Sequence, residues 1–264
     1  MCIRDSVCSN RGAGISIYDL NNKTEFRDCQ IVSNSPSSTN GYGGGVEISY
    51  YCDLVRCVIS GNSVSSNSYG AGAYISGGTL RNCVIANNYI ASGGTSYGGG
   101  IYLQGQDATY RGLIQNCTIY SNAAGAGGGM YWNHHWQALC TNFAVENSII
   151  WANFSHLGTS SNYARSSVPN CKYSFTNCCL APDPGESSTS FRTNCVFSDP
   201  LFAGLAVNNV NLQSGSPCIN AGINRTWMDG AKDMAGRSRI DHFSRQVDMG
   251  AYEFLPKGTL LGGH

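Results

Sequence analysis

The sequence predicts an all-β fold: a right-handed parallel β-helix, in which successive coils of one chain stack into a solenoid. Three observations lead to this prediction. Glycine-rich clusters recur at residues 12–15, 43–46, 70–73, 98–101 and 127–130. A Cys-x-Ile-x-x-Asn-like hexad follows each cluster, and consecutive hexads begin 26 to 34 residues apart. No helical period appears in these units. Self-similarity at such a period is typical of a repeat architecture rather than a globular core.

Each repeat is expected to supply short strands joined by tight bends. Leu80, Cys83 and Ile85 occupy the positions that Leu54, Cys57 and Ile59 occupy in the preceding repeat. Short apolar segments broken by Gly and Asn are typical of strands and turns. Parallel strands lie about 4.8 Å apart, so equivalent residues should form columns along the stack. The right-handed sense follows from the usual chirality of parallel crossover connections.

Two such columns are predicted from the hexads. The cysteine ladder contains Cys29, Cys57, Cys83 and Cys117, with Ser148 in the next repeat. The asparagine ladder contains Asn34, Asn62, Asn88, Asn122 and Asn153. Asparagine suits this position because it tolerates left-handed backbone angles and its amide both donates and accepts hydrogen bonds.

The thirteen cysteines are mostly explained by this ladder. Stacked Cβ atoms stand almost a strand spacing apart, farther than the roughly 3.8 Å of a disulfide, so buried free thiols are expected. Five cysteines lie outside the ladder: Cys52, Cys140, Cys171, Cys179 and Cys218. One or two disulfides could form among them. No metal site is predicted, because no pair of Cys-x-x-Cys motifs is present.

The glycine triad, the strand and the hexad together resemble the right-handed β-helix repeats of chlamydial polymorphic outer-membrane proteins and, more loosely, pectate-lyase-like single-stranded β-helices. Four ordered blocks at residues 199–202, 216–222, 233–237 and 247–253 resemble the terminal module of choice-of-anchor Q domain proteins. That resemblance implies an exported bacterial β-helix protein with a surface anchor downstream. Asn220 stands where the pattern more often has Asp, and Cys218 where it has Ala.

The expected organisation has four parts. Residues 1–6 break the repeat pattern and are interpreted as a spurious prefix, residues 7–204 as β-helix repeats, residues 205–254 as a C-terminal capping module, and residues 255–264 as a tail. We expect an extracellular or cell-surface protein whose signal peptide preceded the present N-terminus. No apolar run is long enough to span a bilayer.

Charge excludes one class of partner. The chain has 16 basic and 16 acidic residues, and charged residues make up 12% of it, so no basic face is available for nucleic acid. The surface is instead polar through Ser, Thr, Asn and Tyr. This composition fits a protein that binds a polysaccharide or surface glycan, and equally one that is simply well hydrated. The oligomeric state is left open.

The richest candidate for ligand binding is the cluster at Tyr131, Trp132, His134, His135 and Trp136. Aromatic faces with a few polar groups can stack on sugar rings. The competing interpretation is that alternate members are core residues. Tyr42, Tyr69 and Tyr97 each precede a glycine cluster and should form an aromatic column, which could be a sugar platform or could rigidify the turns.

In the C-terminal module, Arg237 is predicted to pair with Asp248 or Glu253, close to Asp233, and to hold the last segment across the open end of the coil. Exposed strand edges at a terminal coil need such shielding. The alternative is a calcium site among these acidic side chains. An equal number of basic side chains in the module weakens that interpretation. No other cofactor is expected.

These observations predict an exported bacterial cell-surface protein with a structural or adhesive, carbohydrate- or partner-binding role, and no catalytic residue is assigned. The alternative is a polysaccharide lyase or glycoside hydrolase, which would need paired carboxylates on either side of the scissile bond. Acidic residues in the repeats are sparse and scattered. A trimeric spike would require exposed apolar stripes that the sequence does not contain.

Overall fold

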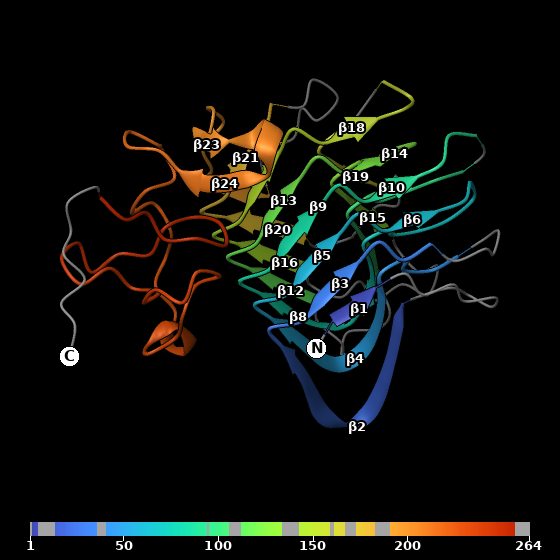
Figure 1. Cartoon of the computed structure of the whole chain (residues 1–264), viewed down its shortest axis with the longest axis horizontal. Coiled ribbons are helices and arrows are strands. Elements are labelled where there is room, and N and C mark those ends of the chain that lie inside the picture. Colours follow the sequence, from blue (N-terminus) through green and yellow to red (C-terminus); the bar gives the residue numbers. More distant parts are fainter. Residues whose placement is uncertain are drawn as a thin grey trace.

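The computed structural model describes residues 2–4, 14–35, 41–93, 95–105, 112–133, 143–158, 161–166, 173–182 and 191–256. Regular structure in these residues is strand, apart from short 3-10 turns at Leu205–Val207 and Thr226–Met228. Parallel strands of successive repeats stack on one another (Figure 1). The predicted parallel β-helix is therefore confirmed as a parallel β-solenoid.

A representative coil contains four strands. They are β7 (Ala73–Ser76), β8 (Gly78–Arg81), β9 (Val84–Ala86) and β10 (Tyr89–Ile90). The next glycine cluster then leads into β11 (Ile101–Gln104), which pairs with β7 in parallel.

The hexad strands, together with β1, form a seven-stranded parallel sheet, which we call the hexad sheet. Its strands in order are β1 (Cys2–Arg4), β3 (Gln30–Val32), β5 (Val58–Ser60), β9, β13 (Thr118–Tyr120), β17 (Ile149–Trp151) and β21 (Cys179–Leu180). A smaller sheet follows the asparagine ladder and consists of β6 (Ser63–Val64), β10, β14 (Ala123–Ala124) and β18 (Phe154–Ser155).

The third sheet has two rows that meet at the long strand β4 (Val46–Val55), which also pairs with β2 (Ile15–Arg27). The β7 row contains β7, β11, β15 (Met130–Asn133) and β19 (Tyr163–Arg165). The β8 row contains β8, β12 (Gly112–Gln115), β16 (Phe143–Glu146), β20 (Tyr173–Thr176) and β22 (Arg192–Thr193).

Like residues stack in the core, because every coil keeps the same register. The hexad isoleucines pair directly from strand to strand and are fully buried: Ile31, Ile59, Ile85, Ile119 and Ile150. Leu54, Leu80, Ile114 and Val145 form the facing column in the β8 row. Burying such branched side chains is the main stabilising contribution, at about 1.5–3 kcal/mol each.

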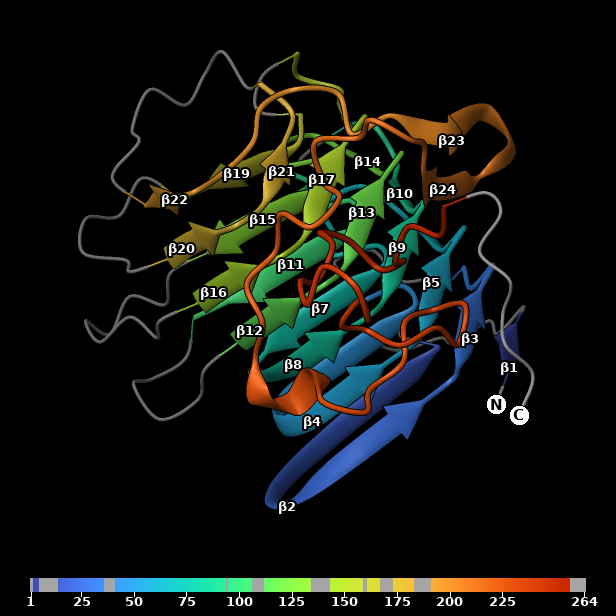
Figure 2. The ribbon, with the colours of Figure 1, turned by 90° about the vertical axis from the view of Figure 1, so that its left-hand side faces the viewer.

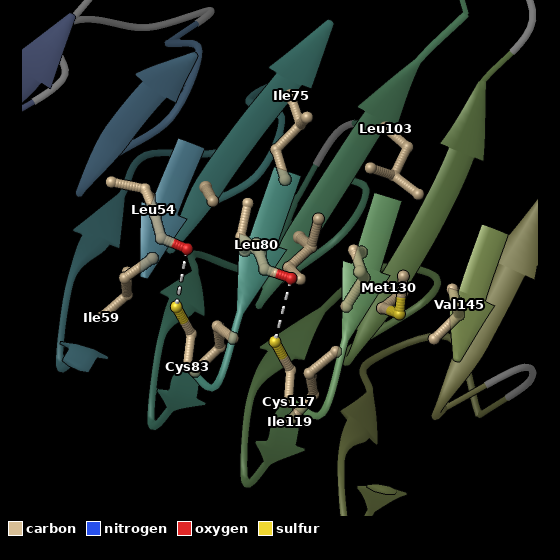
Figure 3. Packing of buried hydrophobic residues seen from close by; sticks show 14 of the residues in the cluster. Leu54, Ile59, Ile75, Leu80, Cys83, Leu103, Cys117, Ile119, Met130 and Val145 are labelled. Atoms are coloured by element: carbon tan, nitrogen blue, oxygen red, sulfur yellow. Dashed lines mark hydrogen bonds between the residues drawn. The ribbon is translucent and has the colours of Figure 1, made fainter. Parts of the chain in front are cut away.

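The structure places the hexad cysteines in one buried column as free thiols. The thiols of Cys57, Cys83 and Cys117 each donate to a carbonyl of the preceding coil, whereas Cys29 donates to Arg27 O. Figure 3 shows the hydrogen bonds from Cys83 Sγ to Leu54 O (3.5 Å) and from Cys117 Sγ to Leu80 O (3.6 Å). Burial raises the pKa of Cys83 well above its ordinary value, so this thiol stays protonated. Ser148 continues the column and donates to Glu146 O at 2.8 Å.

The asparagine ladder is a continuous hydrogen-bonded chain. The Nδ2 of Asn62 donates to Asn88 Oδ1 (2.9 Å), that of Asn88 to Asn122 Oδ1 (2.9 Å), and that of Asn122 to Asn153 Oδ1 (3.0 Å). Asn34 begins the chain by donating to Asn62 Oδ1 at 2.8 Å. Each acceptor oxygen also receives the backbone N–H of the asparagine one coil earlier.

Left-handed backbone angles do occur at this corner, but one position before the ladder. Ser33, Asn87 and Ser121 have φ of 58°, 55° and 53°, whereas the ladder asparagines are not among the residues with positive φ. The expectation that the ladder uses asparagine for left-handed φ is therefore wrong. The amide geometry explains its presence, because one side chain satisfies groups on both neighbouring coils.

A second left-handed corner precedes the cysteine ladder. Here φ lies between 49° and 54° at Asp28, Arg56, Asn82, Asn116, Asn147, Asn177 and Asn194. These two corners per coil turn the chain sharply between the β8 row, the hexad sheet and the small sheet.

The C-terminal segment, residues 205–254, lies along the side of the solenoid (Figures 1 and 2). Amides of four successive corner asparagines donate to its backbone carbonyls: Asn82 to Lys232, Asn116 to Asp248, Asn147 to Ile223 and Asn177 to Ala221, at 2.9–3.1 Å. Its apolar residues, including Cys218, Met249 and Ala251, pack on the outer face of the hexad sheet. The C-terminal segment was predicted to lie across the open end of the coil, but it lies along the side of the solenoid. The amide groups of the corner asparagines supply hydrogen-bond donors to it there.

Candidate binding face and C-terminal cluster

Six tyrosines gather on the outer side of the β7 row, and we call this set the tyrosine face. Tyr42, Tyr69 and Tyr97 form parallel bridges just before the glycine clusters. Tyr74, Tyr102 and Tyr131 stand directly opposite one another on β7, β11 and β15. The side chains of Tyr74, Tyr102 and Tyr131 point outward because side chains alternate along a strand and the residues that flank these three tyrosines point into the core.

The two tyrosine columns pack against each other. Ring centroids lie 5.5 Å apart for Tyr42–Tyr69 and 5.4 Å for Tyr74–Tyr102, both stacked. Between the columns, Tyr69–Tyr102 are 4.9 Å apart and Tyr97–Tyr131 are 4.3 Å apart. Contacts of this kind add about 0.5–1.5 kcal/mol per pair beyond burial. The six rings therefore form one continuous aromatic cluster.

Burial differs among the six tyrosines. Tyr102 and Tyr131 are almost fully buried, while Tyr42, Tyr69, Tyr74 and Tyr97 remain half-buried. Burial raises the pKa of Tyr131 to about 12 and raises that of Tyr102 further, so these hydroxyls remain neutral donors. Tyr102 OH donates to Gln104 Oε1 at 3.3 Å, and Asn133 Nδ2 donates to the same oxygen at 3.2 Å.

The described outward positions beside these rings carry one carboxylate, Glu47, which pairs in register with Tyr74. Ser49, Ser76, Gln104 and Asn133 occupy the neighbouring outward column. Amides and hydroxyls next to aromatic rings can bind a neutral polar ligand. They do not supply the two carboxyl groups that glycoside hydrolysis needs.

The predicted cluster around Trp132 is divided by the structure. Tyr131 belongs to the tyrosine face, whereas Trp132 points into the core, 3% exposed, and packs against Tyr173 and Phe175 at 5.3 and 5.2 Å. Trp132 is therefore not available for stacking on a sugar. His134, His135 and Trp136 lie outside the described residues.

The C-terminal segment contains a buried ionic cluster. Arg239 is fully buried, and its Nη2 contacts Glu253 Oε1 at 2.8 Å and donates to the carbonyl oxygens of Asp248 and Gly250. Arg237, the predicted partner of these acids, donates instead to the backbone carbonyl of Glu253 at 2.6 Å. The contact with the Glu253 carboxyl group thus comes from the arginine two residues later.

The three carboxylates of this cluster accept backbone N–H groups. Asp233 accepts from residues 235, 237 and 253, Asp248 from residues 220 and 254, and Glu253 from residue 248. Burial raises the pKa of Asp248, and it raises the pKa of Glu253 to about 8. These hydrogen bonds fold the segment on itself. A pocket of about 340 Å³ adjoins the cluster and is also lined by Asn220, Asp241 and Phe243.

Within the described part of the chain, no group of three or more His, Cys, Asp or Glu side chains is arranged to hold a metal ion. No described helix has the length and apolarity to cross a bilayer.

Comparison with known proteins adds no relative: no protein-family model matches the chain, and no curated protein matches it significantly.

Proposed function

We propose that this chain is an exported bacterial cell-surface β-helix protein, similar to choice-of-anchor Q proteins, with a non-catalytic structural or adhesive role in which the tyrosine face binds carbohydrate. The observation that carries the proposal is the double column of stacked tyrosines beside a polar column on one side of the solenoid.

The chemistry of that face suits a sugar. A pyranose ring offers C–H groups that pack on aromatic rings and hydroxyls that bond to amides, and carbohydrate sites combine both features. Gln104 and Asn133 provide amide groups next to Tyr102. Coil spacing of about 4.8 Å repeats these groups along the axis, which favours an extended glycan over a single sugar.

A non-catalytic role is supported by how the buried acids are used. Asp233, Asp248 and Glu253 are committed to backbone N–H groups and Arg239, as expected of residues that hold a fold together. A lyase or hydrolase would need such groups facing substrate.

The surface-protein assignment draws on the four terminal sequence blocks. In the structure these blocks bond to one another: Ser216 Oγ to Pro200 O, the Met249 N–H to Cys218 O, and the Met234 N–H to Ala251 O. The motif residues therefore have a shared structural reason to occur together, which supports the resemblance to that module.

The test is binding to a panel of neutral and uronic-acid polysaccharides by affinity electrophoresis. Tyr69→Leu and Tyr97→Leu keep apolar volume but remove the stacking surface, and they should weaken binding. Tyr89→Leu is the matched control, because Tyr89 is exposed on β10 in a different sheet. Retention by none of the polysaccharides, or unchanged retention in both tyrosine-face variants, would contradict the proposal. New reducing ends or unsaturated products, with or without calcium, would instead establish an enzyme.

A further inference from the structure

A cavity of about 330 Å³ lies where the C-terminal segment meets the corner between the β8 row and the hexad sheet. The solenoid contributes Arg27, Arg56, Arg81 and Asn82, and the C-terminal segment contributes Trp227 and Lys232. We call it the junction cavity. It is separate from the tyrosine face, which lies on the β7 row.

Basic side chains outnumber acidic ones in the lining. Four basic side chains stand against one carboxylate, Asp229. Arg27 and Arg56 each use two guanidinium N–H groups on the adjacent Glu25 and Asp28, and a guanidinium has five. Donors therefore remain for a ligand on both arginines.

Arg81 and Lys232 are less completely neutralised. Arg81 lies 3.6 Å from Asp53 Oδ2, donates to Gln115 Oε1, and stacks its guanidinium over the Trp227 ring at 5.3 Å. Lys232 Nζ donates to Ser238 Oγ, and no described carboxylate comes within ion-pair distance of it. These two groups are the strongest anchors for an anion.

Two of the lining residues each carry a buried polar atom that has no described partner. Asn82 is 1% exposed, and its Oδ1 has no hydrogen-bond partner among the described residues, while its Nδ2 is used on Lys232 O. Trp227 Nε1 is also buried without a described partner. Leaving a buried donor or acceptor unpaired costs about 1–3 kcal/mol.

We propose that the junction cavity binds an acidic sugar residue, with its carboxylate or sulfate group on Arg81 and Lys232 and its ring against Trp227. The planar guanidinium favours an oxyanion, and the Trp227 ring supplies an apolar wall for a sugar ring. The site would anchor a charged glycan at the seam between the two parts of the chain.

The experiment uses the whole chain and follows the Trp227 indole N–H in a ¹H–¹⁵N spectrum, assigned by its loss in Trp227→Phe. Glucuronate and glucose 6-sulfate are titrated, with glucose and inorganic sulfate as probes that each lack one half of the proposed ligand. Saturable shifts of this signal with either acidic sugar, weakened by added salt, are expected.

Lys232→Gln should lower the affinity at least about tenfold, and Arg81→Gln should do the same. Lys232 is exposed, so its variant tests the site even if Arg81→Gln is too unstable. Arg165→Gln, at an exposed position on β19, is the control and should bind normally, as should Tyr69→Leu.

No shift with any acidic sugar, or equal affinity in Lys232→Gln, would overturn the proposal. Equal binding of glucose would remove the role of the anion, and equal binding of inorganic sulfate would remove the role of the sugar. Either result contradicts it. Because the tyrosine face is not part of this site, failure here leaves the proposed function to its own test.

Discussion

Asn88 lies in the middle of the asparagine ladder, and its replacement by alanine is expected to destabilise the protein strongly. Its Oδ1 accepts from the backbone N–H and the Nδ2 of Asn62, at 3.0 and 2.9 Å. Its Nδ2 donates to Ile59 O and Asn122 Oδ1, at 3.0 and 2.9 Å. The residue is fully buried, so water cannot replace these partners without entering the core.

The magnitude follows from those four bonds. At about 1 kcal/mol for each bond between neutral buried groups, the loss is about 4 kcal/mol. For a chain of this size such a loss lowers the melting temperature by on the order of 10 °C. The isosteric change Asn88→Asp should also be costly, because it replaces a donor with a buried charge facing the oxygens of Ile59 and Asn122.

Thermal unfolding followed by circular dichroism measures the effect. Asn87→Gly is the matched control: Asn87 is adjacent, exposed and at φ 55°, a conformation glycine adopts freely, and its amide bonds Asn208 on the surface. Asn87→Gly should melt within a few degrees of the parent. If Asn88→Ala also does, the ladder contributes little and the reasoning is refuted.

Three further outcomes are expected. Gly72→Ala should destabilise severely, because a Cβ there would lie 2.5 Å from Gly100 O and 2.8 Å from Asn88 Nδ2; a melting temperature near the parent's would show that the coils can separate to make room. The Cys178 thiol lowers the pKa of half-buried Cys195 to about 7, so peptide mapping should find its alkylation rate rising through pH 7, whereas Cys83 should react only after unfolding; early labelling of Cys83 would refute its burial. Glu253 has its pKa raised by burial from 4.5 to about 8, so the folded state holds the proton more tightly and the contribution to stability, full below pH 4.5, is lost as pH rises towards 8. In Glu253→Gln, the free energy of unfolding measured with urea should vary less with pH between 4.5 and 8. An unchanged pH dependence would show that groups other than Glu253 cause it.

The stacked part of the fold could be predicted because equivalent residues in successive repeats occupy the same environment. Equivalent hexad residues recur at fixed positions, so Ile59, Ile85 and Ile119 had to form one column. The same logic applied to the glycine clusters would have placed Trp132 correctly. It stands third after its triad, in line with inward-facing Leu103 and Ile75, while Tyr131 stands with outward-facing Tyr102.

The C-terminal segment could not be predicted to the same depth, because it has no repeat to set its register. Arg237 and Arg239 are equally basic and both lie near the acids in sequence. Burial alone separates them, and it depends on how the segment folds over Asn116 and the hexad sheet. The junction cavity was missed for the same reason, since its residues come from both parts of the chain.

The four corner asparagines give the solenoid a mechanical property that stacking alone does not. In an array whose coils contact only their neighbours, unfolding can start at an end and proceed one coil at a time. Here Asn82, Asn116, Asn147 and Asn177 attach one peptide segment to four levels of the stack. Unfolding any one of these coils must also break or distort the C-terminal segment that is hydrogen-bonded to the other three. The segment therefore couples the four coils, so that a force along the solenoid axis is distributed over all of them rather than concentrated on the terminal coil.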